Sequence, residues 1–224
     1  MIHEEQAMRD RTRVFADRSA AGHILGRMLA PHYSRVPDVQ VLAIPMGGIP
    51  VAVPISEHLG CPLDLIIVRK IQIPGNTEAG FGAMTHSGEM FLNKSLIASL
   101  GLRPDQVDRQ AKRVKQELAE RNRLLRGGQE FPDLRGKTVI VVDDGLASGY
   151  TMKASLYMAA KYRALRRIVA VPTAPGRTAY RLADEVEALY CPNMRNGLSF
   201  AVADAYRSWH DLSEQEALEL LRGG

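Results

Sequence analysis

The stretch TVIVVDDGLASGYT, residues 138–151, decides how the rest of the sequence is interpreted. Its first five residues are all β-branched, which is typical of a strand buried on both faces of a parallel sheet. Two acids follow directly, and small residues then lead into a helical pattern over residues 152–162. Such a turn presents backbone N–H groups to an anion at the helix start, and Asp143 and Asp144 can accept hydrogen bonds from neighbouring hydroxyls. The stretch therefore predicts a site for a sugar phosphate.

Further segments alternate in type on both sides of this stretch and predict an α/β fold. Short apolar runs predict strands and amphipathic patterns predict helices. The strands are expected at residues 39–44, 63–68, 168–171 and 186–190, and the helices at 49–59, 106–126 and 177–183. This alternation is typical of a parallel sheet with right-handed crossovers. We expect a parallel twisted sheet that is flanked by helices.

Two segments do not follow this alternation. Residues 71–88 are rich in glycine and have no clear period, which predicts a mobile binding loop. The tail after residue 192 ends in a short helix that begins with a capping box at Ser213 and Glu216. Neither an internal repeat nor a low-complexity linker occurs, so the sequence predicts a single domain over residues 1–224.

The composition is that of a soluble globular protein, with 46% hydrophobic and 24% charged residues. A formal net charge of only +4 gives no reason to expect a nucleic-acid partner. The N-terminus is polar and acidic, and no apolar run approaches the roughly 20 residues of a membrane span. Cys61 and Cys191 lie far apart without metal-ligand spacing, which indicates reduced thiols. We expect a cytoplasmic protein.

The acids and glycines of residues 143–151 have a simpler alternative interpretation. Turns that follow parallel strands often contain Asp and Gly without binding anything. The full order of residues favours a binding site, because Ser148 and Thr151 add hydroxyls and Gly149 permits close backbone approach to a phosphate.

Residues 143–151 resemble the loop that binds 5-phosphoribosyl-1-diphosphate (PRPP) in the type I phosphoribosyltransferases, most of all in adenine phosphoribosyltransferase. The resemblance extends to IPMGGIPVA at residues 44–52, which is similar to the family's pyrophosphate loop. VRK at 68–70, followed by IPG at 73–75, is similar to the end of the second strand and the flexible catalytic loop. Across nearly its whole length, the chain resembles a group of bacterial and archaeal predicted phosphoribosyltransferases.

This resemblance implies a role for each part of the phosphate loop. Asp143 and Asp144 are expected to hold the ribose 2- and 3-hydroxyls and to stabilise positive charge on the ribose. The 5-phosphate is expected on the segment Ala147, Ser148, Gly149, Tyr150 and Thr151. Mg²⁺ is the expected cofactor, and it would arrive on the pyrophosphate of PRPP, with contact to Asp143 and Asp144 as an option.

The pyrophosphate is expected to contact Met46, Gly47 and Gly48, together with Arg69 and Lys70. The alternative for the two cations is a salt bridge at the rim of the sheet, and for the two glycines a tight turn. Met46 departs from the family pattern, because relatives commonly carry Arg or Lys there. A thioether cannot attract pyrophosphate electrostatically, so more depends on Arg69 and Lys70.

The source of a general acid or base is open. Ala147 stands where hypoxanthine-type enzymes carry an Asp, and alanine cannot transfer a proton. Glu78, in the predicted mobile loop, is the candidate beside the catalytic residues Asp143, Asp144 and Lys70. An ordinary solvated loop acid is the alternative interpretation of Glu78.

The family's hood over the acceptor would come from residues 1–35 and 192–224, around a core at about 36–191. Phe200, Tyr206 and Trp209 are the aromatic residues that could stack on a base, although such residues more often belong to the core. The sequence does not identify the acceptor. A homodimer is the expected assembly, because the family often forms dimers.

The sequence thus predicts an enzyme that transfers phosphoribose from PRPP to a nitrogenous acceptor with release of pyrophosphate. The alternative is a PRPP-binding regulator of the same fold with weak or absent turnover, which Met46 favours. The basic helix at residues 109–126 alternates its charges with Glu117 and Glu120, which indicates a solvated face. An RNA contact through this helix is the other interpretation.

Overall fold

The predicted strand at residues 138–142 is β7 (Thr138–Val142), and every residue in it is buried. It lies inside a six-stranded sheet of order β1-β10-β8-β7-β2-β3, in which all neighbours run parallel. The predicted parallel sheet is confirmed. Its other strands are β1 (Ile2–His3), β2 (Val39–Ala43), β3 (Leu63–Leu65), β8 (Arg166–Ala170) and β10 (Ala188–Tyr190).

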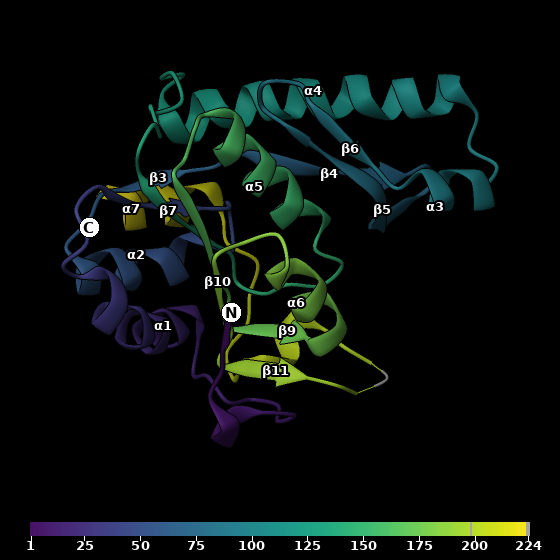
Figure 1. The fold of residues 1–224 in the computed structure, drawn as a ribbon. Helices are drawn as coiled ribbons and strands as arrows, with labels where there is room; N and C mark the ends of the chain where they lie inside the picture. The colour runs from purple at the N-terminus through teal and green to yellow at the C-terminus, as the bar shows by residue number, and fades with distance from the viewer. Residues whose placement is uncertain (198, 223–224) are drawn as a thin grey trace. The chain divides into compact units, whose positions relative to one another are not determined.

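The computed structural model describes residues 1–197 and 199–222, without the side chains of residues 77 and 78 (Figure 1). The chain divides into two compact units. The first unit holds residues 1–66, 132–149 and 159–224, and the second holds residues 67–131 and 150–158. Within the described residues, the helices are too short or too polar to cross a lipid bilayer.

The register of the central strands brings two loops of the first unit together. Ala43, the last residue of β2, pairs with Val142, the last residue of β7. The segments that follow these strands, residues 44–48 and 143–149, therefore leave the sheet at the same edge. Ligands of parallel α/β sheets bind at this edge, outside the carboxyl ends of the strands.

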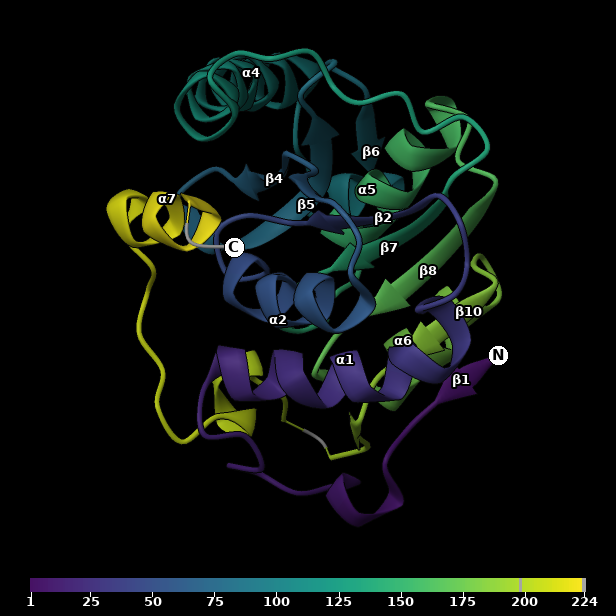
Figure 2. The same cartoon turned by 90° about the vertical axis from the view of Figure 1, so that its left-hand side faces the viewer.

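Helices α1 (Arg18–Tyr33) and α2 (Ile49–Leu59) pack side by side in the first unit (Figure 2). A Cβ on Gly22 would lie 2.4 Å from the carbonyl oxygen of Val51, so glycine allows the two helices to approach closely. Helix α2 has the predicted bounds and ends at Gly60, whose φ of 62° is left-handed. The first unit also contains α6 (Gly176–Ala183) and α7 (Glu214–Arg222).

The second unit has a small sheet of its own, in which β5 pairs antiparallel with β4 and β6. Helix α4 (Pro104–Arg126) packs against β4 and β5, and buries Ala111, Val114, Leu118 and Leu125, whereas Val107 on the same face is half-buried. Helix α5 (Tyr150–Lys161) begins in this unit and ends in the first. The remaining elements are β4 (Val68–Ile73), β5 (Asn76–Thr85), β6 (Met90–Leu92) and α3 (Lys94–Ser99).

The prediction of a long irregular loop at residues 71–88 is wrong. Most of this segment is the hairpin of β4 and β5, with a turn at Pro74 and Gly75. A Cβ on Gly80 would lie 2.3 Å from Cγ of Lys70, and one on Gly82 would lie 2.4 Å from the carbonyl oxygen of Phe91. The glycines are therefore required by close packing within a sheet, and do not indicate an open loop.

The prediction of one continuous strand at residues 63–68 is also wrong. Strand β3 ends at Leu65, and β4 begins at Val68 in a different sheet. The N–H of Ile66 donates to Ala43 of the first sheet, whereas the carbonyl of Ile67 accepts from His86 of the second. A single apolar run thus serves two sheets, which apolarity alone cannot distinguish from one long strand.

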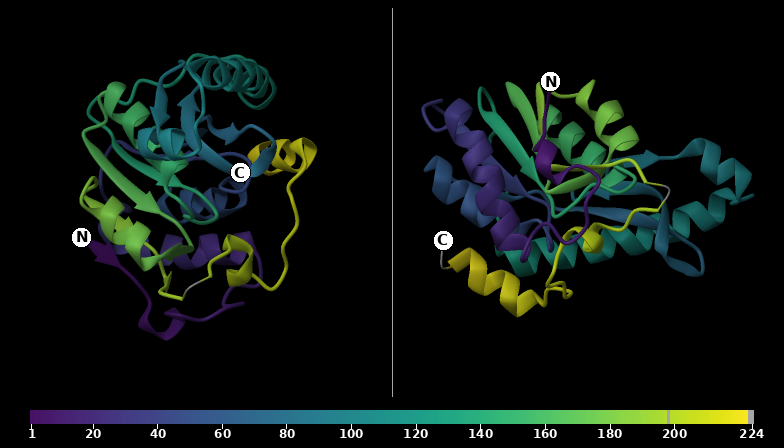
Figure 3. Two further views of the ribbon diagram at one scale, coloured as in Figure 1. Left: turned by 90° about the vertical axis from the view of Figure 1, so that its right-hand side faces the viewer. Right: turned by 90° about the horizontal axis from the view of Figure 1, so that it is seen from below.

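The N-terminal segment and the tail are joined in the first unit (Figure 3). The side-chain amide of Asn193 donates to the carbonyl oxygens of Met8 at 2.5 Å and Arg11 at 3.1 Å. The N–H of Phe15 donates to the carbonyl of Ala205 at 3.0 Å. The elements involved are η1 (Gln6–Met8), β9 (Thr173–Pro175), β11 (Asn193–Arg195) and η2 (Val202–Ala205).

The tail ends in helix α7, which packs against α2. Its predicted capping box is confirmed, because the N–H of Glu216 donates to the Ser213 hydroxyl at 3.2 Å and the N–H of Ser213 donates to Glu216 at 2.8 Å. The division into a core and a hood over an acceptor stays a prediction.

Candidate functional site

Asp143 and Asp144 are half-buried residues at the carboxyl end of β7. The N–H of Asp144 donates to Oδ1 of Asp143 at 2.9 Å, which fixes the two acids relative to each other. Burial raises the pKa of Asp143 well above its usual range, and the charge of Asp144 raises it further. Burial also raises the pKa of Asp144, while Arg18 opposes that rise. Carboxyls with raised pKa values are typical of sites that act on ligands.

The glycine pair after β2 lies against these acids. A Cβ on Gly47 would lie 2.0 Å from Oδ2 of Asp144, and one on Gly48 would lie 2.7 Å from the carbonyl oxygen of Val142. The peptide bond between Pro45 and Met46 is cis. A side chain at either position would have to displace these neighbours. The structure thus brings the predicted pyrophosphate-loop glycines and the acid pair together.

The carbonyl groups of the phosphate loop are held by helix α6. The Thr178 hydroxyl donates to the carbonyl of Ala147 at 3.1 Å, and the Arg181 guanidinium donates to that of Ser148 at 3.1 Å. Gly149 has a φ of 85°, a conformation that side-chain-bearing residues rarely adopt. Ala147 and Ser148 are exposed, so the fixed loop remains open to a ligand.

The other predicted phosphate contacts, Tyr150 and Thr151, begin helix α5. Both are half-buried, and they belong to the second unit. Helix α5 therefore starts immediately after Gly149, and binding of the 5-phosphate at its start stays a prediction.

Arg18, at the start of α1, is a contact that the sequence did not predict. Its Nε lies 2.9 Å from Oδ2 of Asp144, and the two side chains are only 8% and 16% exposed. Its Nη1 donates to the carbonyl of His210 at 2.8 Å, and its guanidinium stacks 3.7 Å from the ring centroid of Trp209. An arginine at the start of a helix carries no local signal for a partner 126 residues away.

The three aromatic residues predicted for the acceptor hood have different surroundings. Tyr206 is buried, its ring packs on Phe15, and its hydroxyl donates to the carbonyl of Asp144 at 2.5 Å. Trp209 is 37% exposed and carries the Arg18 stack. Phe200 is half-buried, with the Arg195 guanidinium 5.4 Å from its ring centroid. Tyr206 therefore supports the acid loop directly, and Trp209 offers the most open ring.

The predicted cations of the second unit lie on β4. Arg69 forms an ion pair with Glu117 of α4, so a salt bridge, the structural alternative, is present. The aliphatic part of Lys70 lies over Gly80. The side chain of Glu78 lies outside the described residues, although its backbone belongs to β5.

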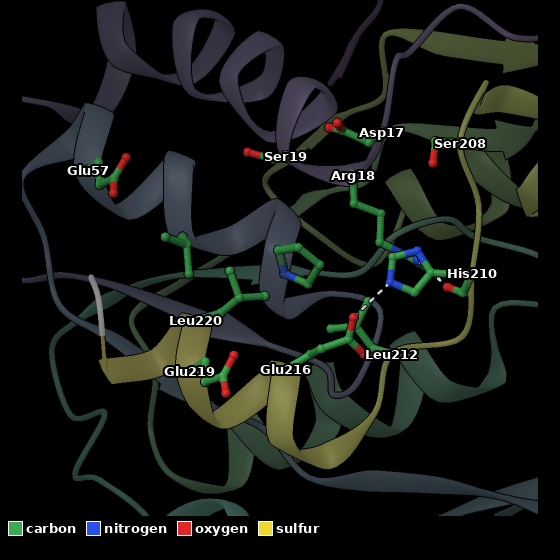
Figure 4. A pocket seen from close by; sticks show the side chains of 12 residues that line it. Asp17, Arg18, Ser19, Glu57, Ser208, His210, Leu212, Glu216, Glu219 and Leu220 are labelled. Carbon is green, nitrogen blue, oxygen red and sulfur yellow. Dashed lines mark hydrogen bonds and ion pairs between the residues drawn. The ribbon is translucent and has the colours of Figure 1, made fainter.

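A pocket of about 670 Å³ lies in the first unit, and Arg18 is one of the residues that line it (Figure 4). It is formed by the start of α1, one face of α2, the tail and α7. Its floor is apolar and its rim carries four carboxylates, and His210 pairs with Glu216 at 3.1 Å. Its volume is in the range of small-molecule sites. Its lining includes Asp17, Arg18, Ser19, Pro50, Val53, Glu57, Ser208, His210, Leu212, Glu216, Glu219 and Leu220.

A family model described as the phosphoribosyl transferase domain matches residues 21–187. The chain belongs to the phosphoribosyl transferase family. The matched residues include both loops at the carboxyl edge of the sheet, so the acid pair and the glycine pair both lie within the matched region.

Two relatives from Mycobacterium tuberculosis, strains CDC 1551 and H37Rv, have the name "Putative phosphoribosyl transferase". Each is 34% identical over 212 residues, a match that covers 93% of this chain and 46% of the relative. The chain thus spans about half the length of these curated relatives. Among solved structures, TT1426 from Thermus thermophilus is similar with a TM-score of 0.72 and 30% identity, over 92% of this chain and 97% of that one.

Proposed function

We propose that this protein transfers the 5-phosphoribosyl group from PRPP to a nitrogenous acceptor and releases pyrophosphate. The observation that carries the proposal is the placement of Asp143 and Asp144 against Gly47 and Gly48, in a chain of the phosphoribosyl transferase family. Two carboxylates beside a glycine-rich backbone segment suit a sugar diphosphate, because hydroxyls need acceptors and phosphates need N–H donors.

The acid pair serves the donor in two ways. As hydrogen-bond acceptors, the carboxylates orient the ribose hydroxyls. As negative charges in a half-buried site, they stabilise the positive charge that develops on the ribose when the bond to pyrophosphate breaks. The 5-phosphate would bind at residues 147–151, and Arg69 and Lys70 are the proposed cationic contacts of the pyrophosphate.

The expected Mg²⁺ fits this chain as an ion carried by the substrate. Among the described residues, no group of three or more His, Cys, Asp or Glu side chains could enclose a metal. Asp144 already pairs with Arg18, and the raised pKa values of both acids show the cost of their charge in this site. When bound, Mg²⁺ would neutralise charge on the departing pyrophosphate, and Asp143 and Asp144 would hold it or its water ligands.

We propose that the pocket beside Arg18 receives the acceptor. Apart from one face of α2, it is built from the chain segments that the sequence predicts as the hood, with lining residues between 17 and 19 and between 208 and 220. Its volume of about 670 Å³ suits a nucleobase or a molecule of similar size. Four rim carboxylates favour an acceptor that donates hydrogen bonds or carries an amine.

The decisive measurement is pyrophosphate release from PRPP and Mg²⁺ with a panel of purines, pyrimidines and small amines. We expect one acceptor class to support turnover, and Asp144→Asn to reduce PRPP affinity. If no acceptor in the panel supports pyrophosphate release although PRPP binding is measurable, the proposed transferase activity is refuted. Unchanged PRPP affinity in Asp144→Asn would refute the ribose contact.

A PRPP-binding regulator without turnover is the second candidate, and two observations favour it. Met46 supplies no cation to the pyrophosphate loop, and Arg69 already pairs with Glu117. The same assay separates the candidates, because a regulator binds PRPP without consuming it.

We further propose that the protein acts in the cytoplasm as a homodimer. Light scattering at micromolar concentration measures the assembly directly, and a mass of one chain would refute the dimer.

A further inference from the structure

Arg18 is a nearly buried cation with partners on two sides. On one side its Nε pairs with the carboxylate of Asp144 at 2.9 Å. On the other, Nη1 donates to the carbonyl of His210 at 2.8 Å, and the guanidinium plane lies 3.7 Å from the centroid of the Trp209 ring. One side chain therefore connects the acid loop after β7 with the tail that lines the pocket.

The chemistry of the guanidinium makes this connection specific. Its planar fork can donate in two directions and stack on an aromatic face at the same time, which an ammonium group cannot reproduce. Its pairing with Oδ2 does not consume the acceptor capacity of Oδ1, so Asp144 can still bind a hydroxyl. A Cβ on Gly47 would lie only 2.0 Å from Oδ2. That oxygen therefore lies against the backbone of Gly47 as well as against Arg18.

We propose that Arg18 is a positioning residue that couples the donor loop to the tail segment carrying Trp209 and His210. This proposal rests on the proposed function, because the ligand expected at Asp144 is PRPP. A ribose hydroxyl that binds Asp144 shifts the carboxylate or polarises it, and Arg18 passes this change to Trp209. The tail, and with it the wall of the pocket, then differs between the free and the donor-bound protein.

Trp209 makes the proposal measurable, because it is the only tryptophan of the chain. Its intrinsic fluorescence reports the Arg18 stack without a label, while calorimetry measures PRPP binding independently of the tail. The variants are Arg18→Lys, which keeps the charge, and Arg18→Met, which keeps much of the length. Arg27→Met is the matched control, because Arg27 is an exposed residue of the same helix.

We expect PRPP with Mg²⁺ to change Trp209 emission in the wild type and in Arg27→Met. Arg18→Lys and Arg18→Met should bind PRPP about tenfold more weakly, because the Asp144 carboxylate is no longer held in place, and should lose the emission change even at saturation. A merely structural role would lower thermal stability without abolishing the emission change at saturating PRPP. Circular dichroism confirms folding, and Arg18→Lys serves if Arg18→Met does not fold.

Three outcomes would overturn the proposal. The first is PRPP binding to the wild type, seen by calorimetry, with no change in Trp209 emission. The second is an unchanged affinity and emission response in Arg18→Lys. The third is an absence of PRPP binding to the wild type in calorimetry, which refutes the proposed function itself and is distinguishable from the other two.

Discussion

A Cβ on Gly47 would lie 2.0 Å from Oδ2 of Asp144, well inside the distance that real Cβ atoms keep. The backbone after β2 and the carboxylate after β7 therefore share one small space. Their neighbourhood follows from the register of the sheet, which pairs the last residues of the two strands, Ala43 and Val142.

Gly47→Ala should disturb the site more than the fold. The new methyl must displace the Asp144 carboxylate, because its nearest neighbours are all atoms of that carboxyl group. We expect a loss of about 1–3 kcal/mol of stability, typical of overpacking, and at least about a tenfold loss of PRPP affinity. Thermal unfolding and calorimetry measure the two effects. Gly197→Ala is the control, because its Cβ would lie 3.6 Å from its nearest neighbour, an ordinary contact.

Asp143→Asn should stabilise the protein at neutral pH while weakening the donor site. Burial and the charge of Asp144 raise the pKa of Asp143, so the folded protein binds its proton more tightly than the unfolded chain does. The contribution of Asp143 to stability is therefore fully present below the unfolded pKa of about 3.9 and is lost as pH rises through the folded value. The amide keeps an oxygen for the N–H of Asp144 and carries no charge.

Thermal unfolding of both proteins between pH 4.5 and 8 tests this expectation. The gain in Tm for Asp143→Asn should grow with pH, by about 2–4 °C for each kcal/mol in a chain of this size. If the gain in Tm shrank as pH rises, the charge of Asp143 would stabilise the folded protein, which contradicts the expectation.

Val53→Phe should block the pocket without affecting the donor loop. Val53 lies on α2, lines the pocket and is half-buried. A phenyl ring there occupies space that the acceptor needs, so we expect KM for the acceptor to rise about tenfold with unchanged PRPP affinity. Val53→Ala, which enlarges the pocket, is the matched control. Equal kinetics in Val53→Phe and the wild type would place the acceptor elsewhere.

Arg69 and Glu117 offer a test of the pyrophosphate assignment. The side chains are 32% and 28% exposed, so their ion pair contributes less than about 1 kcal/mol to stability. Arg69→Gln should weaken PRPP binding about tenfold, because a cationic hydrogen-bond donor to the pyrophosphate group is lost. Glu117→Gln removes the same ion pair but leaves the cation, and should keep PRPP affinity within about twofold. Equal losses in both variants would show that only the ion pair matters.

Short-range sequence patterns identified the helices and strands that are determined by neighbouring residues in the sequence. A run of β-branched residues marked the buried strand β7, a mostly apolar run marked β2, and helices α2 and α4 ended before the left-handed glycines 60 and 127 as expected. The same rules failed at Gly80 and Gly82, because glycine signals a turn in most contexts. In β5 the reason for glycine is the close approach of Lys70 and Phe91, which lies outside the local sequence.

The candidate site shows the same division. The acid pair and the glycine pair could be predicted from the sequence, since each belongs to a short motif at the end of a strand. Arg18 could not be predicted, because its role arises only when α1 is packed near the end of β7. The sequence predicts Tyr206 as a possible stacking residue, but the hydrogen bond from its hydroxyl to the carbonyl of Asp144 depends on the fold of the tail.

The bonds from Asn193 to Met8 and Arg11 have a practical consequence for engineering. The two ends of the chain are fastened into one body, so neither can be exchanged alone without leaving backbone carbonyls unpaired. A chimera that aims to change acceptor preference should therefore transplant the N-terminal segment and the tail from the same donor protein. By the same reasoning, substitutions in these two segments should be inherited in matched pairs.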